Sequence, residues 1–187
     1  MIQWSEAMIA RAISLQTLER KCIVLVDNCN WTGHECDVLA VTRDLRIIDI
    51  EVKISRADLK ADAKKDKWWH RQYGAWMPGQ RRQEVTTTAR QHPPKVWKHY
   101  YALPADIWKP ELLDFLPSAA SGVLLLRQAS DRHQGQIVVK CIRRATPATD
   151  AYRLTPAQAV DIARLANLRM WEAYRRRDLA QQQGAAA

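Results

Sequence analysis

The sequence lacks the features that mark several large classes of protein. No apolar run approaches the roughly 20 residues that a membrane-spanning helix needs, and the longest, Val123–Leu126, is no longer than a strand. The first residues do not place a basic stretch before an apolar one, so we expect no secretory signal. Four cysteines are too few for a disulfide scaffold. We therefore expect a cytoplasmic protein that makes no contact with a membrane.

A glycine-rich nucleotide-binding loop, a nucleophile elbow and internal repeats are also missing. The 187 residues suffice for one domain with a hydrophobic core, but not for an enzyme with a separate cofactor lobe. We therefore expect a single domain over 1–187. Within it, the polar, proline-punctuated segment 77–96 is predicted to be a mobile loop and the tail 179–187 to be frayed.

The periodicity of apolar residues predicts a mixed α/β (α+β) domain with a mixed sheet. A helix is expected over about 6–19, begun by Ser5, and a second from Ser55 to about Tyr73. The expected strands cover 22–26, 36–42, 47–54, 99–103, 122–127 and 136–142. A capping box at Thr155 predicts a last helix to about residue 177, with a core stripe of Val160, Ala163, Met170, Trp171 and Tyr174.

Basic residues are in excess: 29 Lys+Arg stand against 20 Asp+Glu, a net charge of +9. Such an excess favours a polyanionic partner, most often nucleic acid. More than half of the net charge falls between Arg56 and Arg90, and several of the basic residues there recur at helical spacing. We take these residues as candidate phosphate contacts: Lys60, Lys64, Lys67, Arg71, Arg81 and Arg82. The alternative is a solvated helix of mixed charge.

Carboxylates occupy unexpected places in two neighbouring strands. Over 47–54 apolar and polar residues alternate, so Asp49, Glu51 and Lys53 share one face. The preceding strand is apolar on both faces except for Asp37. A hairpin that turns on Asp44 would set Asp37 opposite Glu51, about 4.5–5.5 Å apart at Cβ. Two carboxylates so close repel each other unless one is protonated or a divalent cation lies between them, and oxygen ligands suit Mg²⁺ or Mn²⁺.

This pattern resembles the PD-(D/E)xK nuclease superfamily. The resemblance rests on Asp37, thirteen intervening residues, and then the triplet Glu51-Val52-Lys53, after an N-terminal helix. The surrounding residues, 33–39 and 51–58, are similar to small bacterial and phage members, including the MmcB-like DNA-repair proteins. Cys36 stands where the name-giving proline would be. The resemblance implies a restriction-endonuclease-like αβββαβ core, extended here by further strands and a C-terminal helix.

The resemblance also implies roles for individual residues. Asp37 and Glu51 would bind Mg²⁺ (or Mn²⁺) through their carboxylates, with the Val52 carbonyl as a third ligand. Lys53 would orient or activate the attacking water and stabilise the charge that develops on phosphorus. Glu6 matches a position where many members carry a further metal-linked acid. It fits equally well as an acid that the helix dipole favours.

Cys29, His34 and Cys36 suggest zinc, but their spacing matches no standard knuckle, and alternation predicts that Cys36 points away from the face of Asp37. His70 and His99 have no obvious partner and are expected to be structural.

The residues and the resemblance together predict a metal-dependent phosphodiesterase that hydrolyses DNA. One alternative is a non-catalytic DNA-binding repair-accessory module on the same fold, and another is a basic partner-binding protein. A homodimer remains open, because small nucleases that cut both strands often work as dimers.

Overall fold

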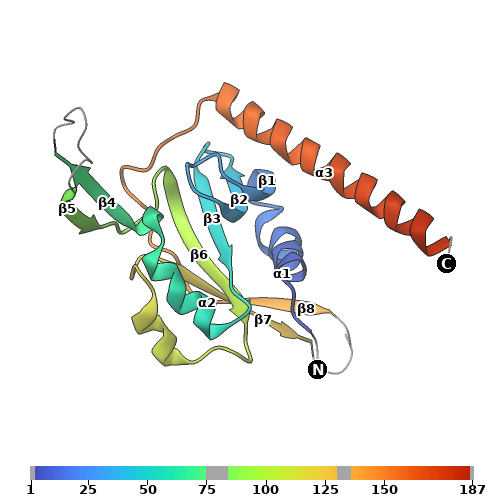
Figure 1. The fold of residues 1–187 in the computed structure, drawn as a ribbon, viewed down its shortest axis with the longest axis horizontal. Helices are drawn as coiled ribbons and strands as arrows, with labels where there is room; N and C mark the ends of the chain where they lie inside the picture. Colours follow the sequence, from blue (N-terminus) through green and yellow to red (C-terminus); the bar gives the residue numbers. More distant parts are fainter. Residues whose placement is uncertain (1–2, 75–83, 130–135, 186–187) are drawn as a thin grey trace, which may run out of the picture.

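A computed structural model describes residues 3–74, 84–129 and 136–185 (Figure 1). The helices are α1 (Glu6–Ile13), which continues as a π-helical turn over Ser14–Leu18, α2 (Arg56–Ala61) and α3 (Pro156–Ala185). Short 3₁₀ turns cover Asp62–Lys64, Asp66–Trp68 and Pro110–Phe115. The strands are β1 (Cys22–Cys29), β2 (Cys36–Thr42), β3 (Ile47–Val52), β4 (Trp69–Tyr73), β5 (Glu84–Ala89), β6 (Val96–Pro104), β7 (Gly122–Gln128) and β8 (Ile137–Arg143).

Six strands form the main sheet, in the order β1-β2-β3-β6-β7-β8. The pairs β3–β6 and β6–β7 are parallel, and the other three pairs are antiparallel. This mixed sheet with its helices confirms the predicted α/β class. The chain passes from β3 to β6 through α2 and a separate two-stranded sheet, β4–β5. Among the described residues, no helix is long and apolar enough to cross a membrane.

The helices begin where the sequence predicts. The side chains of Ser5 and Ser55 each accept a hydrogen bond from the backbone N–H three residues on, which satisfies an otherwise unpaired donor. At α3 the capping box is complete: Thr155 Oγ1 accepts from the Gln158 N–H at 3.2 Å, and Gln158 Oε1 accepts from the Thr155 N–H at 2.9 Å.

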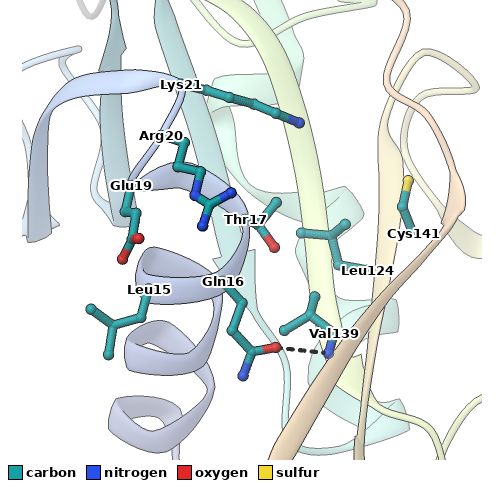
Figure 2. Close-up of a pocket in the computed structure, with 9 residues that line it drawn as sticks. All are labelled: Leu15, Gln16, Thr17, Glu19, Arg20, Lys21, Leu124, Val139 and Cys141. Atoms are coloured by element: carbon teal, nitrogen blue, oxygen red, sulfur yellow. Dashed lines mark hydrogen bonds between the residues drawn. The ribbon is translucent and has the colours of Figure 1, made fainter.

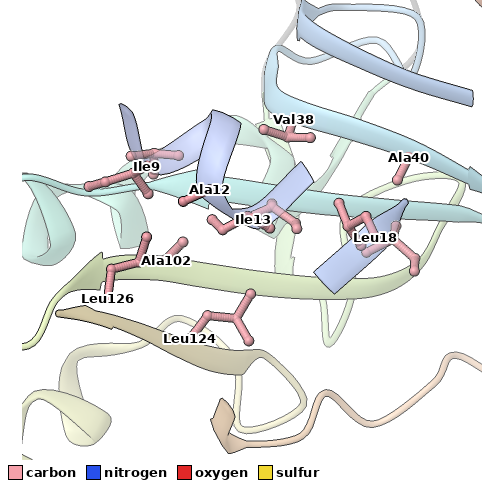
Figure 3. Packing of buried hydrophobic residues seen from close by; sticks show 12 residues of the cluster. Ile9, Ala12, Ile13, Leu18, Val38, Ala40, Ala102, Leu124 and Leu126 are labelled. Carbon is pink, nitrogen blue, oxygen red and sulfur yellow. The ribbon is translucent and has the colours of Figure 1, made fainter. Parts of the chain in front are cut away.

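The alternation of β3 separates an apolar face from a polar one. Ile48, Ile50 and Val52 face α1 and join a core cluster that includes Ile9 and Ile13 (Figure 3). The opposite face of β3 is covered by the segment that follows α2, and it carries the polar residues described below. Because the period of a strand is two, a slip of one residue would exchange these two environments.

The β2–β3 hairpin has the predicted register. Leu39 pairs with Asp49 and Val41 with Ile47. The ladder ends at the pair Val38–Ile50, however, one step before the expected pair of Asp37 with Glu51. There the carboxylate of Asp37 accepts a hydrogen bond from the Val52 N–H at 2.7 Å, in place of a ladder bond.

The predicted helix from Ser55 to Tyr73 is wrong beyond Ala61. After α2 the chain makes two 3₁₀ turns, and Trp69–Tyr73 then forms β4, which pairs with β5. Aromatic and β-branched residues supply both strands, including Thr86–Thr88, and such residues fit a pleated surface better than a helix. The predicted loop 77–96 is therefore wrong over Glu84–Ala89, whereas 90–95 contain no helix or strand. Its first part, 77–83, lies outside the described residues.

The predicted core stripe of α3 is also wrong. Ala159 and Ile162 are buried against the sheet, whereas Val160 and Trp171 are 67% and 60% exposed. Met170 and Tyr174 are exposed too, because only the first turns of α3 lie over the sheet while the rest extends past it (Figure 1). The helix continues to Ala185, past its predicted end near residue 177, and residues 186 and 187 of the predicted frayed tail lie outside the described residues.

We expect Ile162→Ala to lower the free energy of unfolding by about 2–5 kcal/mol, because it removes a fully buried side chain from the contact between α3 and the sheet. Val160→Ala is the matched control on the exposed face and should change stability by less than about 0.5 kcal/mol. Urea denaturation followed by circular dichroism measures both. Equal effects would contradict the observed orientation of α3.

Candidate functional site

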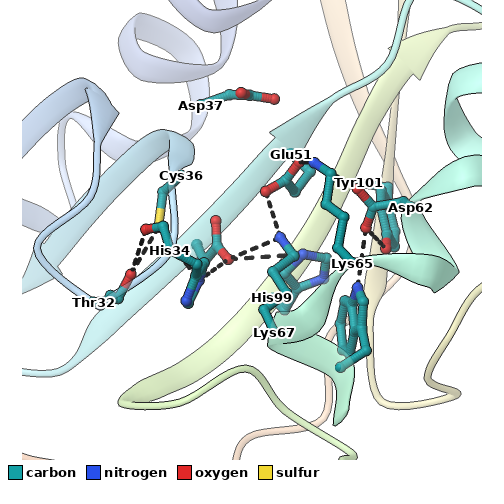
Figure 4. Close-up of polar contacts among 12 residues, drawn as sticks. Thr32, His34, Cys36, Asp37, Glu51, Asp62, Lys65, Lys67, His99 and Tyr101 are labelled. Carbon is teal, nitrogen blue, oxygen red and sulfur yellow. Dashed lines mark hydrogen bonds and ion pairs between the residues drawn. The ribbon is translucent and has the colours of Figure 1, made fainter. Parts of the chain in front are cut away.

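Charged side chains gather on the polar face of β3, and all of them except Lys65 are buried (Figure 4). Three carboxylates and three lysines form the network: Asp49, Glu51, Asp62, Lys53, Lys65 and Lys67. β3 and the residue after it supply three of these six side chains, and the 3₁₀ turns after α2 supply the others. The formal charges of the six cancel, which is the condition under which burial of ions is tolerated.

Glu51 contacts all three lysines. Its Oε2 atom lies 3.1 Å from Lys53 Nζ and 3.0 Å from Lys65 Nζ, while its Oε1 atom accepts a hydrogen bond from Lys67. Burial is the largest influence and would raise the pKa of Glu51, but the Lys67 and Lys53 ammonium groups together lower it. Glu51 is therefore ionised at neutral pH although its side chain is 1% exposed.

Asp62 contacts two of the lysines that also contact Glu51. Its Oδ1 atom lies 3.1 Å from Lys53 Nζ and 2.8 Å from Lys65 Nζ. Its Oδ2 atom accepts hydrogen bonds from Trp68 Nε1 at 3.1 Å and from the Tyr101 hydroxyl at 2.5 Å. Burial opposes ionisation, but Lys67 and Lys53 lower the pKa of Asp62 below its usual range. The 3₁₀ turns are thereby attached to β3 and β6.

Asp49 faces two histidines as well as a lysine. His34 Nε2 lies 3.1 Å from Asp49 Oδ2, Lys67 Nζ 3.6 Å and His99 Nε2 3.9 Å. Burial would raise the pKa of Asp49, yet Lys67 and the hydrogen bond from His34 lower it. Burial lowers the pKa of His99 to about 4, so its ring is neutral at pH 7.

Cys36 lies beside His34, with its Sγ atom 3.7 Å from His34 Nε2 and 3.6 Å from Thr32 Oγ1. Alternation predicts that Cys36 points away from the face of Asp37, and in the structure its Sγ atom lies in the group formed with His34 and Asp49. Cys36 is the first residue of β2 and is in register with Cys29 on β1.

Asp37 lies at the edge of the cluster, near the ends of β2 and β3 (Figure 4). Burial, followed by the charge of Glu51, raises its pKa to about 6. The predicted repulsion between these two carboxylates is thus present, although they are not paired in the ladder. The third residue of the predicted catalytic set, Lys53, is buried between Glu51 and Asp62.

Two groups of side chains bring metal-ligating atoms within 4.8 Å of one another: His34, Cys36 and Asp49, and Asp49, Glu51 and His99. Asp49 belongs to both groups. Glu6, the further acid that the resemblance implies, is exposed in the first turn of α1. In the described part of the chain Glu6 has neither a hydrogen bond nor an ion pair to these carboxylates.

The predicted basic stripe does not form, because the helix that would carry it ends at Ala61. Lys60 and Lys64 are exposed, and Lys60 Nζ lies 4.0 Å from the centre of the Phe115 ring. Arg71 lies on β4, 2.9 Å from Asp66. Lys67 is buried, with its ammonium turned to Glu51, so it cannot serve as a surface contact for phosphate. Arg81 and Arg82 lie outside the described residues.

Sequence reasoning missed Asp62, Lys65 and His99 as members of the cluster, and it set His34 aside because its spacing matched no standard zinc knuckle. The prediction that His99 is merely structural overlooks its neighbour across the sheet, since His99 on β6 is in register with Asp49 on β3. The signal available in the sequence was a strand, a helix and a second strand, because the two strands of such a unit usually lie side by side and parallel. That arrangement would have placed His99 near Asp49.

A pocket elsewhere lies between the turn after α1 and strands β7 and β8 (Figure 2). Its lining residues are Leu15, Gln16, Thr17, Glu19, Arg20, Lys21, Leu124, Val139 and Cys141. Gln16 joins the two elements, because its Oε1 atom accepts from the Val139 N–H at 3.3 Å. No member of the charged cluster lines this pocket, so we do not assign the chemistry to it.

Lys67→Met should lower the free energy of unfolding by about 3–5 kcal/mol, because it leaves buried carboxylates without their counter-ion. Lys64→Met, three residues away on the surface, should change it by less than about 0.5 kcal/mol. Urea denaturation at pH 7 measures both. Similar small effects would show that the Lys67 ammonium is in contact with water.

Asp37→Asn should be more stable than the wild type above pH 6, by on the order of 1–2 kcal/mol. The raised pKa of Asp37 means that the folded protein resists ionisation, so the wild type loses stability as the pH rises from about 4 to 6. The advantage of the variant should vanish near pH 4. Urea denaturation in the presence of a chelator, with Asp44→Asn as the control, measures this. A difference that does not change with pH would contradict the prediction.

Comparison with known proteins adds evidence on the fold. A solved structure, the SPO1766 protein of unknown function from Silicibacter pomeroyi, is similar over 98% of this chain and 97% of its own, with a TM-score of 0.51 and 20% sequence identity. No family model matches the chain, and no curated protein matches it. At this identity the likeness shows a shared α/β fold and nothing about activity.

Proposed function

We propose that this protein is a Mg²⁺- or Mn²⁺-dependent phosphodiesterase that hydrolyses DNA. The supporting observation is that Asp37, Glu51 and Lys53 gather at one end of the β2–β3 hairpin. The Asp37 carboxylate accepts a hydrogen bond from the Val52 N–H, and Lys53 Nζ lies 3.1 Å from Glu51 Oε2. Two carboxylates and a lysine in this arrangement fit the pattern that the sequence shares with the PD-(D/E)xK nucleases.

The donors fit a hard divalent cation. Asp37, Glu51 and the Val52 carbonyl offer only oxygen atoms, which is the ligand type that Mg²⁺ prefers. The charge of Glu51 contributes to the raised pKa of Asp37, and a cation held by both residues would relieve that repulsion. When bound, the ion would polarise a phosphate oxygen and lower the pKa of a bound water.

Lys65 is the residue that could leave Glu51 to make this possible. Its side chain is 47% exposed, whereas those of Lys53 and Lys67 are nearly fully buried. When the Lys65 ammonium turns toward solvent, one oxygen of Glu51 loses a counter-ion and a positive charge reaches the surface. In the proposed reaction Lys53 stays in place, orients the water and stabilises the developing charge.

The exposed Lys60 and Lys64 lie on the segment that directly follows β3. Together with the net charge of +9, they supply the phosphate contacts of the proposal, and Arg71 would add a third. The absence of disulfides among the four cysteines agrees with the reducing cytoplasm that we propose as its compartment.

A second function is favoured by the position of Lys67. Its ammonium lies between Glu51 and Asp49, where it neutralises both without any metal. A cluster whose charges already cancel has no need of a cation for its stability. This observation supports a DNA-binding repair-accessory module that keeps the fold without the chemistry.

The test is divalent-metal-dependent cleavage of duplex, single-stranded and branched DNA. We expect cleavage with Mg²⁺ or Mn²⁺ that Asp37→Asn and Lys53→Ala each reduce by about 10²-fold or more. Asp44→Asn and Lys140→Ala make the same chemical changes at exposed positions and should cleave like the wild type. Circular dichroism establishes that each variant is folded.

Absence of cleavage, with DNA binding that weakens steeply as salt rises, would replace the enzyme by the accessory module. If the protein does not bind DNA even at low salt, both proposed functions are contradicted, and a basic partner-binding protein is the remaining interpretation.

A further inference from the structure

A second set of ligating atoms lies beside the oxygen-rich end of the hairpin and differs from it in chemistry. His34 Nε2 is 3.1 Å from Asp49 Oδ2 and 3.7 Å from Cys36 Sγ. His99 Nε2 approaches the same Asp49 oxygen at 3.9 Å. Figure 4 labels His34, Cys36 and His99, which come from the turn before β2, from β2 and from β6.

The separations match those around a tetrahedral ion. Nitrogen, oxygen and sulfur ligands about 2.0–2.3 Å from zinc lie about 3.3–3.6 Å from one another. The separations of 3.1 and 3.7 Å between His34 and its two neighbours lie close to that range, and the ligand atoms of His34, Cys36 and Asp49 all lie within 4.8 Å of one another. A set of an imidazole, a thiolate and a carboxylate suits zinc and disfavours Mg²⁺, which takes oxygen ligands.

Two buried polar atoms point independently to a ligand. Asp49 Oδ1 and His99 Nε2 have no hydrogen-bond partner among the residues that the structure describes, and both side chains are at most 1% exposed. A buried polar atom without a partner is costly and is uncommon in native proteins. A cation bound by Asp49 would give the Oδ1 atom of this carboxylate the partner that it lacks among the described residues.

Neighbouring residues support this group of side chains. Ser121 Oγ lies 3.0 Å from His99 Nδ1, which orients the ring and leaves Nε2 toward Asp49. Thr32 donates to the His34 carbonyl oxygen at 2.9 Å and contacts Cys36 Sγ, so it links two of the ligands. Such supporting contacts are characteristic of built metal sites.

Lys67 is the charged group that opposes a cation here. Its ammonium lies 3.6 Å from Asp49 Oδ2 but is hydrogen-bonded to Glu51, which keeps it on the Glu51 side of the aspartate. We propose that His34, Cys36 and Asp49 form a zinc site, separate from the oxygen-only site of the proposed phosphodiesterase and independent of whether DNA is cleaved.

The test uses the full-length protein, stripped of metal with a chelator, and two probes. Zn²⁺ titrated against a chromogenic chelator should bind with one equivalent per chain. Co²⁺ in its place should give a thiolate-to-metal charge-transfer absorption, which only a sulfur ligand produces. Cys36→Ser should abolish that absorption and weaken Zn²⁺ binding at least about tenfold.

Cys29→Ser is the matched control, because Cys29 is equally buried and pairs with Cys36 across β1 and β2. It should keep both the absorption and the affinity. If Cys36→Ser fails to fold, His34→Gln should weaken Zn²⁺ binding at least about tenfold while the protein stays folded. Lack of stoichiometric Zn²⁺ binding, or an absorption that survives Cys36→Ser, would overturn the site.

Discussion

Glu51 and its three lysines are the constraint on which the rest of the polar face depends. A carboxylate that is 1% exposed is tolerated only while opposite charges surround it, and those charges come from β3 and from the 3₁₀ turns after α2. The turns are therefore held where Lys65 and Lys67 can reach Glu51. Asp62 and Trp68 belong to the same turns, and their side chains therefore cover β3, which carries the candidate site.

Much of the framework could be predicted because it depends on local rules. The caps at Ser5, Ser55 and Thr155 follow from side chains that satisfy nearby backbone donors. The register of the β2–β3 hairpin follows from its turn, which brings Leu39 opposite Asp49 as predicted. Of the candidate site, this local reasoning identified Asp37, Glu51 and Lys53, all within reach of one hairpin.

The rest of the site depends on contacts between residues distant in sequence. His99 reaches Asp49 only because β6 lies parallel to β3, and Asp62 reaches Lys53 only because the helix after Ser55 stops early. A spacing of three or four residues predicted Lys67 on an exposed helical stripe. The attraction of two buried carboxylates instead turned it inward, and helical periodicity carries no information about such a partner.

The long helix α3 has a mechanical consequence of its own. It is attached to the body by Ala159 and Ile162 near its start and, farther along, by a hydrogen bond from Arg169 to the Asn28 carbonyl oxygen. From Met170 to Gln183 the described side chains are exposed apart from the half-buried Glu172, and a helical segment without such support is marginal in water. We expect amide protons in that outer part to exchange with solvent long before those in the first turns of α3, because the outer part can unwind while the sheet stays folded.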